Sequence, residues 1–283
     1  DVEIIFTCGA GQNVEDARSL VKRFRGSASA RTALEQVWSY WNHTLGVVHV
    51  ETEDKALDVL TNGWLLYQTL SCRMWARTGY YQSSGAYGFR DQLQDSMALI
   101  YAEPEIFREH LLRCASHQFV EGDVLHWWHP PFERGVRTHS SDDRLWLPLA
   151  AHRYVTTTGD VGVLNESTHF ITGGLLAPDE DSCYHLPARS AESGTLYEHC
   201  VRSIKRSLQF GRHGLPLMGT GDWNDGMNHV GYQGLGESVW NAFFLYDVLA
   251  KFKDIAHLFG DSAFAELRAS EAATLRENIR QSG

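Results

Sequence analysis

The chain has 283 residues, of which 43% are hydrophobic and 21% are charged, a balance that excludes a disordered segment and indicates a globular core. Its formal net charge of -10 argues against a surface that follows nucleic-acid phosphates. No apolar run approaches the roughly 18 residues of a membrane span, because even residues 239–252 contain Asn241, Asp247 and Lys251.

The first predicted element is a strand from Val2 to Thr7, which is β-branched and apolar. From residue 14 onward, apolar residues recur at intervals of three and four, the period of amphipathic helices. The pattern predicts helices over residues 14–24, 33–45, 56–70, 90–102, 106–119, 142–156, 196–210, 237–256 and 262–281. Gly260 and Asp261 are a stop and a start signal between the last two helices. No second strand is convincing, so we predict an all-α fold.

Long loops rich in Gly, Trp, His, Pro and Asp separate these helices. They cover residues 81–89, 121–141, 172–193 and 211–236. Structureless loops of this length are uncommon in compact domains unless they carry function. We therefore expect stacked helical hairpins whose loops form a binding face at one end. No short sequence repeat indicates a solenoid.

The cysteines and the chain ends indicate the context of the sequence. Five scattered cysteines without a C-x-x-C pair argue against a disulfide framework or a zinc site and favour a reducing compartment. The first residue is not Met, no basic signal region follows it, and the last residues continue a helical pattern. We expect the chain to be a fragment of a longer polypeptide.

Three patterns suggest a cofactor or a metal, and their details argue against it. Gly9–Val14 lacks the third glycine of a dinucleotide fingerprint, and no βαβ pattern follows. Asp222–Gly226 differs from a calcium loop in the position of its glycine and in the absence of the final Glu. His126 and His129 have metal-ligand spacing, but the two prolines that follow make the segment extended and a third ligand is not evident. We therefore expect no metal and no cofactor.

The loops are enriched in Asp, Arg, His and Trp, the residue types that hold a sugar. Carboxylates and guanidinium groups pair with hydroxyls, while indoles cover the apolar face of the ring. In the first cluster, residues 87–95, Arg90 and Asp91 begin a helix. They either bind the ligand or are exposed charges at the helix cap, and for Asp95 we favour the cap.

The second cluster covers residues 121–131 and 135–143. Asp142 and Asp143 either bind a ligand or cap the apolar helix that follows them. Arg137 either binds the ligand or pairs with one of these two acids and orders the loop.

The third cluster, residues 219–228, has glycines on both sides of Trp223 and Asp225. Tight turns at the glycines would place these two side chains on one side of an extended segment, because alternate residues share a face. A carboxyl group partly dried by an indole tends to be protonated near neutrality, as a general acid acting on a glycosidic oxygen must be. The alternative is an Asx-type turn that stabilises the loop.

Four segments resemble the hallmark motifs of glycoside hydrolase family 94: residues 87–95, 121–131, 136–143 and 221–240. The family comprises cellobiose and chitobiose phosphorylases and related β-glucan enzymes, and the resemblance covers nearly the whole chain. Within the family, the sequence is most similar to the C-terminal phosphorylase-like region of cyclic β-1,2-glucan synthases and to 1,2-β-oligoglucan phosphorylases.

The resemblance implies an (α/α)6 barrel preceded by a β-sandwich. It assigns residues 1–13 to the end of the β-sandwich, residues 14–50 to a helical linker and residues 51–283 to the N-terminal part of a truncated barrel. The family's phosphate-binding His and the Thr-Gly backbone site that follows it lie later in the barrel. We therefore expect them beyond Gly283.

The reaction implied by the resemblance is inverting phosphorolysis. One Asp protonates the glycosidic oxygen while inorganic phosphate attacks the anomeric carbon from the opposite face and releases α-glucose 1-phosphate. By motif position, Asp225 matches the general acid, while Trp223 and Asp91 match residues that hold the sugar at the cleaved bond. The other substrate-binding candidates are Arg90, Arg137, Asp142, Asp143 and Asn224.

The expected partners are a β-glucan oligosaccharide, inorganic phosphate as co-substrate and the remainder of the polypeptide; a homodimer is left open. The expected location is the cytoplasm or the cytoplasmic side of a membrane-bound glucan synthase. Residues 83–87 lack the Arg that disaccharide phosphorylases of the family tend to carry, which favours an oligoglucan over cellobiose. Two alternatives stay open: a cellobiose-type phosphorylase, and a non-catalytic carbohydrate-binding or chain-length-regulating module.

Overall fold

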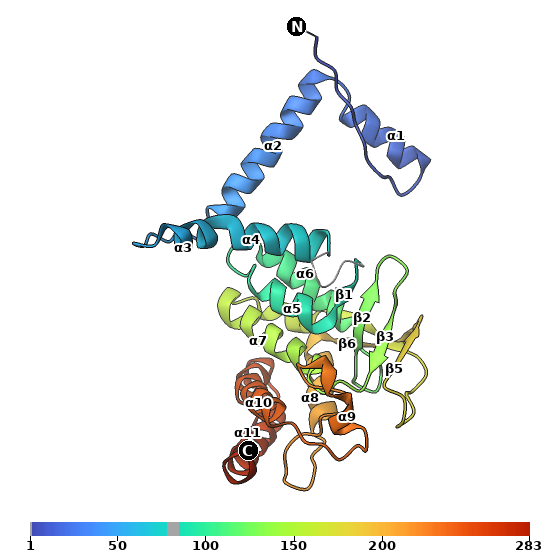
Figure 1. The fold of residues 1–283 in the computed structure, drawn as a ribbon, viewed down its shortest axis with the longest axis vertical. Helices are drawn as coiled ribbons and strands as arrows, with labels where there is room; N and C mark the ends of the chain where they lie inside the picture. The colour runs from blue at the N-terminus through green and yellow to red at the C-terminus, as the bar shows by residue number, and fades with distance from the viewer. Residues whose placement is uncertain (1, 78–84) are drawn as a thin grey trace. The chain divides into compact units, whose positions relative to one another are not determined.

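A computed structural model describes residues 2–77 and 85–283, which form two compact units that meet in sequence between Tyr67 and Gln68 (Figure 1). Residues 81–84 of the first predicted loop, including Ser83 and Ser84, lie outside the described residues. No helix in the described ranges combines the length and the apolar character that crossing a bilayer requires.

The first unit is helical. Its elements are α1 (Val14–Arg23), α2 (Ser27–Leu45), α3 (Lys55–Val59), η1 (Leu60–Trp64) and the beginning of α4 (Leu65–Gln68). Asn13 begins α1, because its side chain accepts hydrogen bonds from two N–H groups of the first turn. The helical period predicted over residues 56–70 is interrupted at Gly63, whose φ of 125° is left-handed.

The predicted strand at Val2–Thr7 is wrong. This segment is irregular and pairs with no other strand in the part of the chain that the structure describes. An apolar, β-branched run is not sufficient for a strand, because the backbone N–H and C=O groups also need a partner strand.

The second unit contains most of the predicted helices. Its helical elements are η2 (Thr69–Trp75), α5 (Phe89–Met97), α6 (Pro104–Ala115), η3 (Asp143–Leu145), α7 (Trp146–Thr158), η4 (Val161–Asn165), α8 (Leu196–Ser207), η5 (Asp225–Met227), α9 (Asn228–Gly231), α10 (Val239–Phe259) and α11 (Ser262–Ser282). The predicted break between the last two is confirmed: Gly260 ends α10 with a left-handed φ of 91°, and the side chain of Asp261 caps α11.

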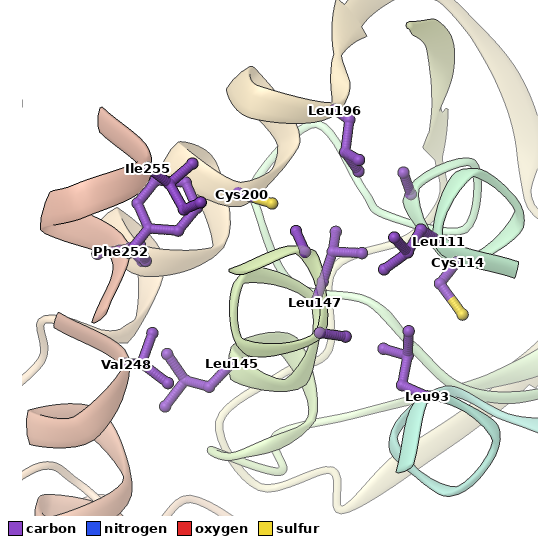
Figure 2. Close-up of a cluster of buried hydrophobic side chains, with 14 of the residues drawn as sticks. Leu93, Leu111, Cys114, Leu145, Leu147, Leu196, Cys200, Val248, Phe252 and Ile255 are labelled. Atoms are coloured by element: carbon purple, nitrogen blue, oxygen red, sulfur yellow. The ribbon is translucent and has the colours of Figure 1, made fainter. Parts of the chain in front are cut away.

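The core of the second unit lies among α5, α6, α7, α8 and α10 (Figure 2). Leu93, Leu111, Leu147 and Cys200 are fully buried where these helices meet, and Phe252 of α10 packs on the same cluster. The helices predicted in this part of the chain therefore enclose its core. The loops that join these helices are fixed at their ends by this core.

The prediction of an all-α fold is incomplete, because the second unit also contains two antiparallel sheets. The larger sheet has the order β1-β2-β3-β5, formed by β1 (Tyr87–Gly88), β2 (Leu125–His129), β3 (Arg134–Thr138) and β5 (Ser182–His185). The smaller one pairs β4 (Ser167–Thr172) with β6 (Ala188–Thr195). Strands β1, β2, β3 and β5 lie inside the predicted loops. β4 ends at the first residue of the predicted loop at residues 172–193, and β6 begins inside that loop and ends two residues after it.

Candidate functional site

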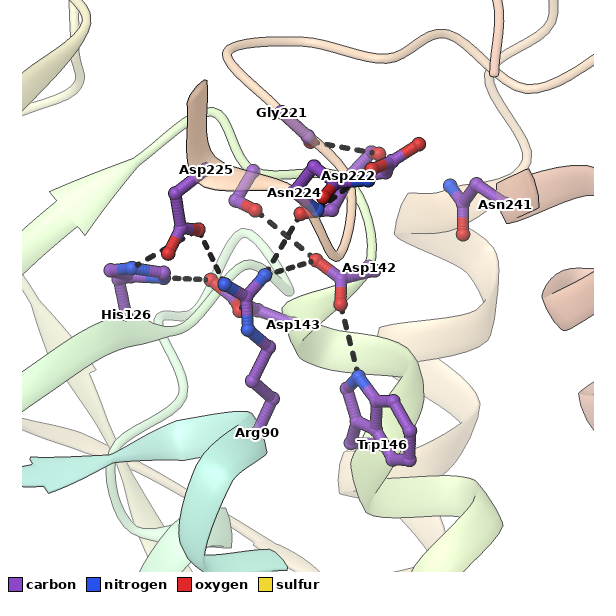
Figure 3. A network of polar contacts seen from close by, with 12 residues as sticks. Arg90, His126, Asp142, Asp143, Trp146, Gly221, Asp222, Asn224, Asp225 and Asn241 are labelled. Atoms are coloured by element: carbon purple, nitrogen blue, oxygen red, sulfur yellow. Dashed lines mark hydrogen bonds and ion pairs between the residues drawn. The ribbon is translucent and has the colours of Figure 1, made fainter. Parts of the chain in front are cut away.

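The sheet edge and the helix starts bring the three sequence clusters together. Arg90 lies in the first turn of α5 directly after β1, and His126 lies on β2. Asp142 and Asp143 precede α7, and Asp225 lies in the loop between α8 and α10 (Figure 3).

The loop that carries Asp225 is fastened to the segment that carries the aspartate pair. The backbone N–H and the hydroxyl of Ser141 both donate to the carbonyl oxygen of Gly221, at 2.9 and 3.1 Å. Gly219 has a left-handed φ of 66°, and a Cβ at this position would overlap the carbonyl oxygen of His139. Glycine is required here because the two backbones approach so closely.

Arg90 is the centre of the site and is 5% exposed. Its Nη1 donates to Asp142 Oδ1 at 3.0 Å and to the carbonyl oxygen of Asp222 at 2.8 Å, and its Nη2 donates to Asp225 Oδ1. Nη1 also lies 3.7 Å from Asp143 Oδ1. Burial alone would lower the pKa of Arg90, but the three carboxylates raise it, so the guanidinium stays charged. The alternative of an exposed charge at a helix cap is therefore wrong for Arg90.

Asp142 and Asp143 are buried and held by hydrogen bonds. Asp142 accepts from the Ser140 hydroxyl at 3.2 Å and from the Trp146 indole N–H at 3.0 Å, besides Arg90. Burial, followed by the charge of Asp143, raises the pKa of Asp142 to about 6. In the described chain the side chain of Asp142 makes no capping hydrogen bond to the short helix η3 that it precedes. Ordering the site, rather than capping a helix, is what Asp142 does in this structure.

His126 is a member of the site that the sequence reasoning missed, since it considered this residue only as a metal ligand. Its Nδ1 lies 2.7 Å from Asp143 Oδ2, and its Nε2 lies 3.8 Å from Asp225 Oδ1. The charge of Asp143 raises the pKa of His126 to about 9, so the imidazole is a second cation. Asp143 has a lowered pKa: its burial acts in the opposite direction, but the charge and hydrogen bond of His126 prevail. The H-x-x-H spacing is typical of metal ligands and does not indicate the neighbouring acids Asp143 and Asp225.

Asp225 differs from the other two carboxylates on Arg90 in its accessibility. Its side chain is 65% exposed, whereas those of Asp142 and Asp143 are 0% and 3% exposed. It lines a cavity of about 270 Å³ together with His126 and Ser140. Asp225 is therefore the carboxylate of this cluster that a ligand can reach.

Asp222 and Ser238 form a support for this loop, and sequence reasoning did not assign them a role in the site. The Asp222 carboxylate accepts from the Asn224 N–H at 2.9 Å, which is the predicted Asx-type turn, and from the buried Ser238 hydroxyl at 2.6 Å. Ser238 also caps α10, because its hydroxyl accepts from the Asn241 N–H. The Asx-type turn and an exposed Asp225 thus occur in the same loop, because Asp222 forms the turn and Asp225 is the exposed acid.

Three of the other predicted site residues lie beside the cluster. Asp91 is in the first turn of α5, where its carboxylate covers Gly88 so closely that a Cβ would not fit. Trp223 is 50% exposed and Asn224 is exposed, on the same loop as Asp225. All three therefore stay substrate-binding predictions.

Arg137 is not paired with Asp142 or Asp143, as one interpretation expected. It binds Asp123 through Nε and Nη2, at 2.7 and 2.8 Å, and Glu121 through Nη2 at 3.0 Å, and it lies 3.7 Å above the Phe119 ring. Its two acidic partners come from the turn before β2, so Arg137 orders the β2–β3 region. Its role as a substrate-binding residue stays a prediction.

Comparison with known proteins identifies the family of the chain. The model of the glycosyl hydrolase 94 superfamily catalytic domain matches residues 40–283. Cyclic beta-(1,2)-glucan synthase NdvB of Rhizobium meliloti (strain 1021) is 41% identical over 99% of the chain, which spans 10% of that relative. Solabiose phosphorylase of Paenibacillus borealis is 27% identical over 97% of the chain. N,N'-diacetylchitobiose phosphorylase of Vibrio proteolyticus is 24% identical over 98%.

The chain spans 32% and 35% of the lengths of these two phosphorylases. The family match includes each of the residues that meet at Arg90. The chain belongs to the glycosyl hydrolase 94 superfamily and carries its catalytic-domain sequence from residue 40 to residue 283.

Proposed function

We propose that this chain supplies the general acid of an enzyme that cleaves β-linked glucosides by inverting phosphorolysis. The observation that carries the proposal is the position of Asp225. It is the accessible carboxylate in a cluster whose other acids are buried, and it lines a cavity. Several relatives are phosphorylases, which favours inorganic phosphate over water as the second reactant.

In the proposed reaction, the carboxyl group of Asp225 donates its proton to the glycosidic oxygen as the bond to the anomeric carbon breaks. A phosphate oxygen forms the new bond to that carbon from the opposite face. The products are α-glucose 1-phosphate and a sugar whose hydroxyl carries the donated proton.

The proposed reaction requires a proton on Asp225 when the sugar is bound. Arg90 and His126 supply two positive charges against the three carboxylates of Asp142, Asp143 and Asp225. A glycosyl unit that covers Asp225 removes water from it, and desolvation favours the neutral carboxylic acid. In this proposal Arg90 and His126 orient Asp225, while Asp143 positions His126.

For the substrate we propose a β-1,2-linked glucooligosaccharide. The 41% identical relative is named for β-1,2-glucan, and a second cavity of about 350 Å³ adjoins the first. Thr138, Asp181 and Thr220 line both cavities, so the two are neighbours along one path. Tyr232 lines the second cavity and offers an aromatic face to a further sugar ring. The division into a β-sandwich end, a linker and part of an (α/α)6 barrel belongs to the same proposal.

The test is the release of glucose 1-phosphate by the complete gene product, with and without inorganic phosphate. We expect phosphate-dependent release from sophorooligosaccharides that exceeds release from cellobiose. Faster release from cellobiose would contradict the proposed linkage. Equal sugar release without phosphate would indicate hydrolysis, and sugar binding without turnover would indicate a carbohydrate-binding module.

A further inference from the structure

A third cavity is lined by residues from the end of α6, the β2–β3 turn and strands β4 and β6, and it shares no lining residue with the cavity of Asp225. It has a volume of about 540 Å³ and is lined by Arg113, His117, Glu133, His169 and Arg189, together with uncharged residues. Four of these five groups are basic, in a chain whose net charge is -10. The local charge is therefore opposite to that of the molecule.

The one carboxylate among these residues is already occupied. Glu133 Oε2 lies 2.5 Å from His117 Nε2, while His117 Nδ1 lies 2.7 Å from the carbonyl oxygen of Arg113. The Ser116 hydroxyl also lies 3.1 Å from His117 Nδ1, so neighbouring groups contact both ring nitrogens. His117 stacks on the buried Trp128 at 3.9 Å, which fixes the ring. His117 is thus the hydrogen-bond partner of Glu133.

The pKa of Glu133 is lowered by its hydrogen bond with His117 and, more weakly, by the charge of Arg113. Among the described residues, neither Arg113 nor Arg189 forms an ion pair. Arg113 is nevertheless held in place, because its Nη1 donates to the Tyr87 hydroxyl at 2.7 Å and its guanidinium lies 5.1 Å from the centre of the Tyr87 ring. A fixed guanidinium with free N–H groups is suited to bind a phosphate group through paired hydrogen bonds.

His169 also lines this cavity, and its pKa responds to the positive charges around it. Burial, followed by the positive charges of Arg189 and His117, lowers the pKa of His169. The Glu133 carboxylate acts in the opposite direction and is outweighed. His169 is thus an uncharged hydrogen-bonding group beside two cations.

We propose that this cavity is a binding site for a phosphate group, separate from the catalytic site, with Arg113 and Arg189 as its charged ligands and His169 as a neutral one. The volume exceeds what a single inorganic phosphate requires and falls in the range of small-molecule sites, so a phosphorylated sugar also fits. Inorganic phosphate and a sugar phosphate both present a phosphate dianion to the site, and the experiment below distinguishes between them.

The test is calorimetric titration of the chain with inorganic phosphate and, separately, with glucose 1-phosphate. Arg189→Gln should weaken binding about tenfold, the loss expected for one charge-assisted hydrogen bond. Arg276→Gln removes the same charge from the exposed side of α11 and should leave the affinity unchanged. Tighter binding of glucose 1-phosphate would assign the site to a sugar phosphate, and equal affinities would assign it to inorganic phosphate.

An NMR titration of His169 provides a second readout that does not depend on the catalytic site. A phosphate group in this cavity should raise the pKa of His169, because it neutralises the cations that lower it. The absence of saturable binding, an unchanged affinity of Arg189→Gln, or loss of binding from Arg90→Gln in its place would overturn the proposal. The result is independent of the proposed phosphorolysis, since only binding is measured.

Discussion

Replacing Asp143 by Asn tests the electrostatics of the site at the buried His126–Asp143 pair. The pKa of His126 is about 9 in the structure and 6.5 for an ordinary histidine. At about 1.36 kcal/mol per pKa unit, this difference corresponds to about 3 kcal/mol in favour of the charged imidazole. The charge of Asp143 is the largest cause of this rise. Without it, burial and the charge of Arg90 both lower the pKa of His126, so Asp143→Asn should bring that pKa to 6.5 or below.

The pH dependence follows from the sign of this shift. Because the pKa of His126 is raised on folding, its contribution to the free energy of unfolding is fully present below pH 6.5 and is lost as the pH rises through 9. The difference in unfolding free energy between the original protein and Asp143→Asn should therefore be about 3 kcal/mol at pH 6 and should shrink by pH 9.5.

The assay combines an NMR titration of the His126 ring with urea unfolding at both pH values. Asp247→Asn is the matched control, because it breaks the exposed Asp247–Lys251 ion pair of α10 and should change stability by less than about 0.5 kcal/mol. A His126 that titrates near 6.5 in the original protein, or one that titrates unchanged in Asp143→Asn, would refute the reasoning.

Three further substitutions test the packing that holds the site, each by urea unfolding. Phe252→Ala should cost about 3–5 kcal/mol, because the ring is fully buried in the core of the second unit, and a loss below 1 kcal/mol would contradict that burial. Ser238→Ala should cost about 1–2 kcal/mol, because Asp222 loses its buried donor and α10 its cap; an unchanged stability would show that neither bond matters. Gly219→Ala should cost more than about 1 kcal/mol, because of its left-handed backbone and the His139 carbonyl, and Gly174→Ala, where a Cβ meets open space, is its control.

Local sequence signals predicted the helices well, because those signals act within one or two turns. The apolar period of α10 and the Gly260–Asp261 junction are examples, and the structure confirms both. Several strands were missed because their partners are distant in sequence: Tyr87 of β1 pairs with Trp128, and Val136 of β3 pairs with Tyr184. β6 reads ARSAESGT, which has no apolar alternation to detect.

The same contrast between local sequence signals and contacts between distant segments applies to the candidate site. Residue type and loop position made Arg90, Asp142, Asp143 and Asp225 candidates, and the resemblance to the family selected them; the fold brings the four together. The pairing of His126 with Asp143 depends on β2 lying beside the segment before α7, which no local pattern encodes. Arg137 was paired with the wrong acids for the same reason, since its observed partner Asp123 is closer in space than the acids nearer in sequence.

The most direct test of the account compares Asp225→Asn on two substrates in the complete gene product. A β-glucan needs a proton on its leaving oxygen, whereas 2,4-dinitrophenyl β-glucoside has a leaving group that departs without one. We predict that Asp225→Asn lowers phosphorolysis of the glucan about 100- to 10,000-fold and leaves cleavage of the dinitrophenyl glucoside within a few-fold. Asp181→Asn, which removes another carboxylate from the same cavity, should affect both substrates alike. Equal losses on both substrates in Asp225→Asn, or no loss on either, would contradict the assignment of Asp225 as the general acid.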